Sequence, residues 1–168
     1  LGFPSSAVIK NAKEEIAQAN LPQVRLLHVG LKSSDVPLDD ITGPWTQCTP
    51  ETAAPFSAVA YFFGRDIQRE EHVPIGLIDA TWGGTPIDSW ISLNTLGSDA
   101  SLMPVFANRA QFAQNQVRLN QIIASEKSED AAALAANQPA PKHHWHPQEE
   151  SWLPAGLYNG MIAPETPY

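Results

Sequence analysis

The sequence predicts an α/β fold, and three segments in the middle of the chain carry that prediction. Residues 24–29 are mostly apolar and are bounded by Pro22 and Gly30, as expected of a strand. Residues 56–71 favour a helix, and residues 74–82 form a second short apolar run. Strand, helix and strand in this order predict a βαβ unit. Because the second run lacks strict alternation, it is typical of a central strand covered on both faces.

The helix predicted over 56–71 has a candidate N-cap in Ser57. Its apolar side chains recur at helical spacing, which predicts a buried side, and its charged or amide side chains should face water. The apolar set is Val59, Phe62, Phe63 and Ile67, and the polar set is Arg65, Asp66, Gln68 and Arg69.

The remaining elements are weaker predictions. We expect a short helix over 6–19, a long proline-containing loop over 30–55, a short helical or turn segment over 86–97 and the longest helix over 102–125. Residues 126–150 are polar and proline-rich, which predicts a solvated insertion.

Composition excludes several classes of function. The net charge of −8 and the pI near 4.9 disfavour nucleic-acid and anionic-membrane partners, because both require a basic face. No apolar run approaches the ~18 residues of a membrane span. Since Cys48 is the only cysteine, an intrachain disulfide and a multi-cysteine metal site are both excluded.

The two ends of the sequence predict a fragment of a longer protein. The chain opens on Leu1 rather than methionine, shows no signal peptide, and closes on Glu165-Thr166-Pro167-Tyr168.

The segment from Trp82 to Trp90 is the strongest candidate for chemistry. The apolar run before it leads into Gly83-Gly84, where the backbone can approach a ligand closely and adopt positive φ. Ligands of open α/β sheets bind outside the carboxyl ends of the strands, where this turn falls. Its N–H groups would suit an anion or an oxyanion, and its tryptophans could wall a sugar site. A plain tight turn with buried tryptophans is the alternative.

Other candidates are weaker. The chain contains no phosphate-binding loop, no dinucleotide fingerprint and no G-x-S-x-G elbow, so Ser89 is a poor nucleophile. The histidines of His143-His144-Trp145-His146 could bind zinc, but a solvated or loop-packing cluster is the favoured interpretation. Cys48 is expected to be a buried small hydrophobe. The adjacent pairs Asp39-Asp40 and Glu149-Glu150 are expected to be solvated charge.

Five segments, in order, resemble the sialate O-acetylesterase family of SGNH-type carbohydrate esterases. They include the glycine block and match the family's spacing across most of the chain, with weak coverage near 95–150. The segments are Trp45-x-x-Cys48-x-Pro50-Glu51-Thr52, residues 56–65, residues 73–78, Trp82-Gly83-Gly84-Thr85-Pro86-Ile87-x-x-Trp90 and residues 157–164.

The resemblance implies a three-layer α/β/α, flavodoxin-like parallel sheet, incomplete in this chain, and one esterase domain with a helical, proline-rich insertion at about 98–150. It implies that Gly83 or Gly84, with Gly83 preferred, donates a backbone N–H to the oxyanion. Residues expected to bind substrate are Trp82, Thr85, Asp88, Trp90 and Asn159. Where family members often have Glu-Ala before the second tryptophan, this chain has Asp88-Ser89. The family's Gly-Gln-Ser-Asn and Asp-x-x-His motifs do not occur here.

The expected function of the parent protein is therefore hydrolysis of O-acetyl esters on sugars by a serine nucleophile, without cofactor or metal. The substrate would be an acetylated sialic acid or an acetylated polysaccharide such as xylan. Family analogy suggests export to the periplasm or the outside of a bacterial cell. The rival hypotheses are a non-catalytic carbohydrate-binding or scaffold protein of the same fold and, fitting least well, a zinc hydrolase.

Overall fold

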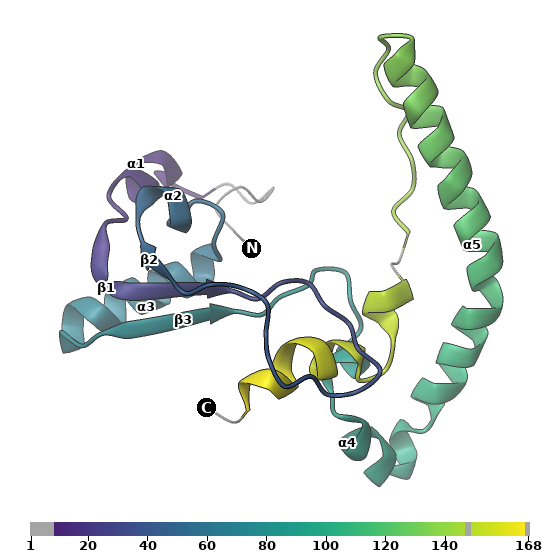
Figure 1. The fold of residues 1–168 in the computed structure, drawn as a ribbon, viewed down its shortest axis with the longest axis horizontal. Coiled ribbons are helices and arrows are strands. Elements are labelled where there is room, and N and C mark those ends of the chain that lie inside the picture. The colour runs from purple at the N-terminus through teal and green to yellow at the C-terminus, as the bar shows by residue number, and fades with distance from the viewer. Residues whose placement is uncertain (1–8, 147–148, 167–168) are drawn as a thin grey trace. The chain divides into compact units, whose positions relative to one another are not determined.

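The structure is a computed structural model that describes residues 9–146 and 149–166. It divides into two compact units, whose elements are shown in Figure 1. Unit 1 comprises Leu1–Leu31 and Asp40–Thr81, and unit 2 comprises Lys32–Asp39 and Trp82–Tyr168. A single esterase domain with an insertion at about 98–150 stays a prediction.

Unit 1 holds a small mixed sheet with helices, consistent with an α/β fold of the SGNH type. Its elements are α1 (Ala12–Ala17), β1 (Leu21–His28), β2 (Thr46–Cys48), α2 (Pro50–Ala53), α3 (Ala58–Glu71) and β3 (Ile75–Asp79). The strand order is β2-β1-β3. β1 pairs in parallel with β3, from Val24 opposite Ile75 to His28 opposite Asp79, which confirms the predicted βαβ unit.

Two features of the sheet differ from the prediction. β2 runs antiparallel to β1, because the chain returns from β1 through a loop rather than through a crossover helix. Of the three described strands β1 is central and β3 lies at an edge, so the expectation of a central β3 covered on both faces is wrong here. Gly76 and Ile78 are accordingly exposed, while Leu77 and Asp79 are buried.

The core of unit 1 lies between one face of the sheet and its helices. Val24, Leu26 and Leu77 point from the strands into a cluster with Tyr61 of α3, whose other buried members are Ala19, Cys48, Ala53, Phe56 and Ala58. α3 approaches β3 closely at Gly64, where a Cβ would lie 2.6 Å from Leu77 Cδ1. A larger residue at that position would therefore push the helix off the strand.

α3 begins where the sequence predicts but turns a different side to the core. The hydroxyl of Ser57 accepts a hydrogen bond from the N–H of Ala60 at 3.4 Å, which confirms the N-cap. The prediction of an inward Val59–Ile67 side is wrong, since the exposed side chains include Val59, Phe63 and Ile67. The helix instead presents its small residues and Tyr61 to the core, because they allow the closest packing.

Arg65 was expected to face water and is instead largely covered, with 14% of its side chain exposed. Its Nη1 donates to the carboxylate of Glu15 in α1 at 2.7 Å, and its guanidinium lies 4.8 Å from the ring centre of Phe62. The side chain therefore ties α3 to α1.

The expected loop over 30–55 is wrong at its end, where β2 and α2 occur. Thr49 and Thr52 form a reciprocal capping box, and Pro50 occupies the first helical turn, where its missing N–H costs nothing. The predicted helix over 6–19 is shorter in the described residues, where α1 covers only Ala12–Ala17; residues 6–8 lie outside them.

In its described residues, unit 2 contains α4 (Leu93–Ser98), α5 (Pro104–Ala135) and five short helical turns. The turns are Ile87–Trp90, Ala100–Leu102, Glu149–Trp152 and Ala163–Glu165, and a π-helical turn covers Tyr158–Ile162. The helical segment predicted over 86–97 is thus confirmed. α5 continues ten residues beyond its predicted end at residue 125, so the first part of the segment predicted as a solvated insertion is helical. None of the described helices has the length and apolar character that a membrane span requires.

Candidate functional site

The glycine block forms a turn over residues 82–85 in unit 2. Gly84 has φ +77°, the value that the third position of a type II turn requires. Gly83 has no positive φ, and a Cβ built on it would meet nothing within 4 Å. Both glycines are exposed, and within 9–146 and 149–166 no hydrogen bond uses their N–H groups. The turn therefore offers two free backbone donors to solvent.

A hydrogen-bonded series braces this turn from within. Thr85 Oγ1 donates to the carbonyl of Trp82 at 2.7 Å and accepts from Trp90 Nε1 at 2.9 Å. Three of the predicted site residues, Trp82, Thr85 and Trp90, are thus brought together. Since both bonds occupy the Thr85 hydroxyl, this side chain holds the turn in shape.

Two tryptophans that the sequence analysis did not assign lie against the same turn. Trp152 Nε1 donates to the carbonyl of Gly84 at 2.9 Å. The ring of Trp145 lies 3.0 Å from the position of a Cβ on Gly84. The two indole centres are 6.3 Å apart with their planes tilted by 44°. The contacts join residues more than 60 positions apart, so no local sequence signal could have revealed them.

Asp88 and Asn159 are joined to each other through the backbone of Ala155. The N–H of Ala155 donates to the carbonyl of Asp88, and its own carbonyl accepts the N–H of Asn159, both at 2.9 Å. Asn159 is buried, and its side-chain nitrogen donates to the carbonyl of Ser34 at 3.2 Å. Asp88 is half-buried.

Asn159 also lines a groove of about 800 Å³ in unit 2. The groove combines carboxylate, amide, hydroxyl and phenol groups, a mixture that suits a polyhydroxylated ligand. Its lining residues are Asp35, Val36, Pro37, Leu38, Asp39, Ser92, Leu93, Asn94, Tyr158, Asn159, Ala163 and Thr166.

The histidine-rich segment is held by carboxylates of α5. His146 Nε2 lies 3.0 Å from Glu126 Oε1, and His143 Nε2 lies 3.0 Å from Asp130 Oδ1. Neither acidic partner was predicted from the sequence, because Asp130 lies 13 residues before His143 and Glu126 lies 20 residues before His146. No group of three or more His, Cys, Asp or Glu within the described ranges is arranged to hold a metal ion.

In unit 1, His28 and Asp79 pair at the carboxyl ends of β1 and β3, another feature that the sequence analysis missed. His28 Nδ1 lies 3.2 Å from Asp79 Oδ2, and Thr81 Oγ1 donates to Asp79 Oδ1 at 2.8 Å. The carboxylate is buried whereas 57% of the histidine side chain is exposed. A buried carboxylate that orients an exposed imidazole is an arrangement able to support proton transfer.

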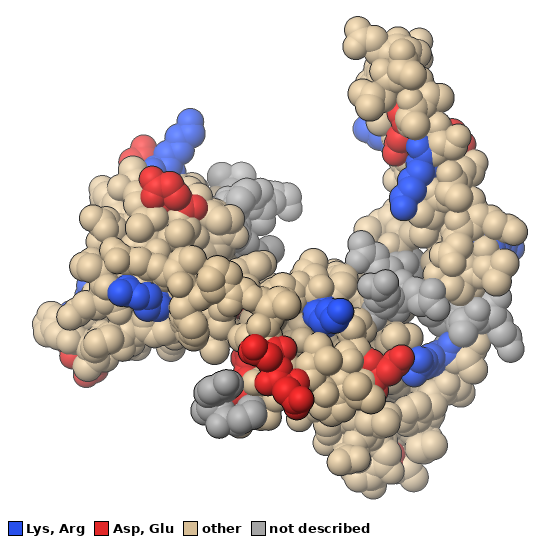
Figure 2. Space-filling view, viewed as in Figure 1, with Lys and Arg blue, Asp and Glu red and all other residues tan. Residues whose placement is uncertain are grey.

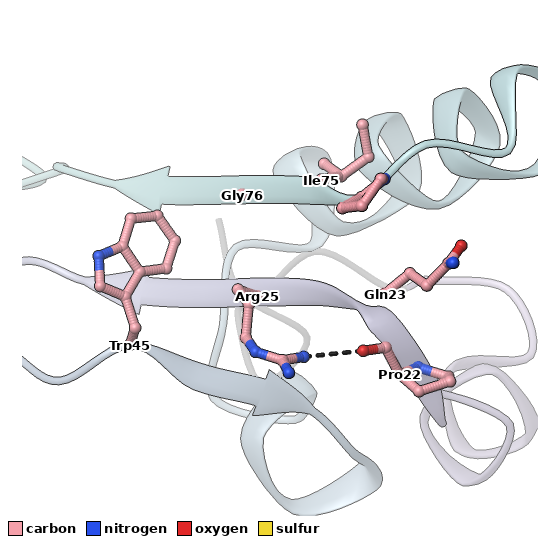
Figure 3. A pocket seen from close by; sticks show the side chains of 7 residues that line it. Pro22, Gln23, Arg25, Trp45, Ile75 and Gly76 are labelled. Carbon is pink, nitrogen blue, oxygen red and sulfur yellow. Dashed lines mark hydrogen bonds between the residues drawn. The ribbon is translucent and has the colours of Figure 1, made fainter. Parts of the chain in front are cut away.

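A second hollow, of about 500 Å³, lies on the sheet of unit 1 (Figure 3). Pro22, Gln23, Pro74 and Ile75 place it at the amino ends of the parallel strands, opposite the end at which α/β sheets bind ligands. Trp45 reaches Gly76, where a Cβ would lie 3.2 Å from the indole, and Arg25 donates to the carbonyl of Pro22.

Cys48, expected to be a buried small hydrophobe, is buried, and burial raises the pKa of its thiol.

Figure 2 shows the charged side chains on one face of the molecule. Lys and Arg side chains lie scattered over the face drawn in Figure 2.

Several known proteins are similar to this chain. The human sialate O-acetylesterase is 35% identical over 97 residues, covering 52% of this chain, and the mouse protein of the same name is 36% identical over the same length. The chain spans only 18% of the length of these curated relatives. No protein-family model matches the chain.

A solved structure gives the same indication over more of the chain. A carbohydrate acetylesterase from Xanthomonas citri covers 95% of the chain with a TM-score of 0.59 and 27% sequence identity, while the chain covers 26% of that protein. The sequence and structure comparisons thus agree with the resemblance of the five ordered segments to the sialate O-acetylesterase family of SGNH-type esterases.

Proposed function

We propose that the chain is part of a carbohydrate O-acetylesterase that transfers the acetyl group of a sugar ester to a serine and then to water. The observation that carries the proposal is the turn at Gly83-Gly84, whose two N–H groups are exposed and make no hydrogen bond in the described part of the chain. Free, fixed donors of this kind stabilise the oxyanion of acyl transfer. The names of the relatives, sialate O-acetylesterase and carbohydrate acetylesterase, support a sugar ester as the substrate.

Gly83 is the preferred oxyanion donor. Gly84 is held through its carbonyl by Trp152 and is approached by the ring of Trp145, whereas apart from its chain neighbours nothing lies within 4 Å of a Cβ built on Gly83. Gly83 is therefore the less crowded of the two glycines. The remaining substrate contacts are assigned to Trp82, Asp88, Trp90 and Asn159. Thr85, also expected to bind substrate, braces the turn through the Trp82 carbonyl and Trp90 Nε1.

The serine nucleophile and its histidine base are not in this chain, which contains neither Gly-Gln-Ser-Asn nor Asp-x-x-His. We expect the purified 168-residue chain to be inactive for that reason. Saturable hydrolysis of an aryl acetate by this chain alone would contradict the expectation. The substrate class comprises acetylated sialic acid and acetylated polysaccharides such as xylan, and the site of action is the periplasm or cell exterior.

A matched pair of substitutions in the longer esterase tests the role of the turn. Gly83→Pro removes the N–H but suits the second position of a type II turn, where proline is common. Gly83→Ala keeps the N–H. We expect Gly83→Pro to lower kcat by about 10²–10³-fold and Gly83→Ala to change it little. Equal activity of the two variants, with both folded by circular dichroism, would remove Gly83 from the oxyanion site.

The rival function is a carbohydrate-binding or scaffold protein that retains the fold without the chemistry. The gene sequence on both sides of this chain distinguishes the two. A serine in Gly-Gln-Ser-Asn before Leu1 and an Asp-x-x-His after Tyr168 favour the enzyme, and their absence favours the binder.

A further inference from the structure

Trp145 is an exposed tryptophan fixed beside the glycine turn. Its side chain is 67% exposed although its ring lies against Gly84. Tryptophan is usually well buried, and a large exposed apolar surface of this kind often marks a binding site. Trp152 lies 6.3 Å away and is itself held to the Gly84 carbonyl, so the two rings form a continuous aromatic surface next to the free N–H groups.

The segment that carries Trp145 is fastened on both sides of it. His146 Nε2 lies 3.0 and 3.1 Å from the two oxygens of Glu126, and His143 Nδ1 lies 3.7 Å from one of them. His143 Nε2 also contacts Asp130 at 3.0 Å. Glu126 and Asp130 are four residues apart and so lie on the same side of α5.

These contacts define a clamp of Glu126, Asp130, His143 and His146. Side chains of His143, His146 and Glu126 are each only 21% exposed, so water competes little for their hydrogen bonds. The clamp therefore limits the positions open to Trp145 between the two histidines. A ring held in advance loses little entropy when a ligand stacks on it.

We propose that Trp145 and Trp152 form a stacking platform for the pyranose ring of a carbohydrate ligand, with Glu126 as the residue that positions Trp145. The inference rests on the proposed function for the choice of a sugar. One face of a pyranose presents C–H groups and packs on an indole, while its hydroxyls remain in water. A sugar on this platform would lie beside the turn that binds the acyl oxygen.

Sugar binding to the 168-residue chain tests the platform without requiring catalysis. Titration with xylotriose and, separately, with the methyl glycoside of N-acetylneuraminic acid is followed by NMR and by tryptophan fluorescence. We expect saturable binding of at least one of them, and Trp145→Ala should weaken it about tenfold or more. Trp45→Ala is the matched control, because Trp45 is a 51% exposed tryptophan of unit 1, whereas the turn belongs to unit 2.

The two sugars distinguish a sialic acid from a polysaccharide as the source of the ring. Absence of saturable binding of both to the wild-type chain would overturn the platform, and so would equal weakening by Trp145→Ala and Trp45→Ala. If the longer protein fails to hydrolyse sugar esters but binding still depends on Trp145, the proposed function fails and the platform stands.

A double-mutant cycle tests the positioning role of Glu126. Glu126→Ala should weaken binding in the wild-type background and have little further effect in the Trp145→Ala background. Glu126→Gln keeps hydrogen-bond acceptance and should recover part of the affinity. Equal losses in both backgrounds would show that Glu126 acts on general stability and not through Trp145.

Discussion

Two adjacent glycines in the turn over 82–85 have different structural requirements. Gly84 adopts φ +77° and has the Trp145 ring 3.0 Å from its Cβ position, so both backbone and space restrict it. Gly83 is restricted by neither. From the sequence the two glycines form one flexible unit, whereas in the structure Gly84 determines the shape of the turn and Gly83 leaves room for a ligand.

Gly84→Ala should therefore destabilise the chain, and Gly83→Ala should not. The left-handed conformation costs a residue with a Cβ about 1–2 kcal/mol, and the contact with Trp145 adds to it. Urea denaturation of both variants measures the free energy of unfolding. If Gly83→Ala lowered the free energy of unfolding as much as Gly84→Ala, the turn would have to differ from the one described.

At the scale of secondary-structure elements, α3 shows the limit of periodicity arguments. Its start at Ser57 follows from local capping chemistry and was predictable. Its buried side was not, because packing against β3 selected the residue with no side chain, Gly64, over the larger Val59 and Phe63. Judged by hydrophobicity alone, Val59 and Phe63 would be buried before Gly64.

Two glycine substitutions in helices test the importance of this close packing. Gly64→Ala places a methyl group 2.6 Å from Leu77 Cδ1 and should cost about 1–3 kcal/mol of stability, despite the better helix propensity of alanine. Gly97→Ala in α4, where nothing lies within 4 Å of the added Cβ, should be neutral or stabilising by up to about 1 kcal/mol. Thermal melting compares them, and a Gly64→Ala variant as stable as Gly97→Ala would contradict the packing.

At the scale of the whole molecule, burial of ionisable groups links stability to pH. Burial is the main cause that raises the pKa of Cys48 and of Tyr61 above their usual ranges. Both groups are neutral when protonated, so the unfolded chain loses these protons first as the pH rises. Their contribution to stability is fully present below the unfolded-state pKa and is lost at higher pH.

The free energy of unfolding should therefore fall as the pH rises above about 8.5, the ordinary pKa of a cysteine. Cys48→Ala removes one of the two groups and should make the free energy of unfolding decrease less steeply with pH, whatever its effect on stability at neutral pH. Urea unfolding at a series of pH values between about 7 and 10.5 measures both slopes. Identical slopes for the wild type and Cys48→Ala would contradict the burial of the thiol.

The order of the βαβ unit, the cap of α3, the glycine block and the family resemblance were predictable, because each depends on residues close together in the chain. The buried side of α3, the pairing of His28 with Asp79 across 51 residues and the contact of Trp152 with Gly84 across 68 were not predictable, because they arise from packing. Such contacts depend on how elements pack, and packing responds to shape as well as to hydrophobicity. The glycine turn could thus be located from the sequence, while the aromatic residues against it could not.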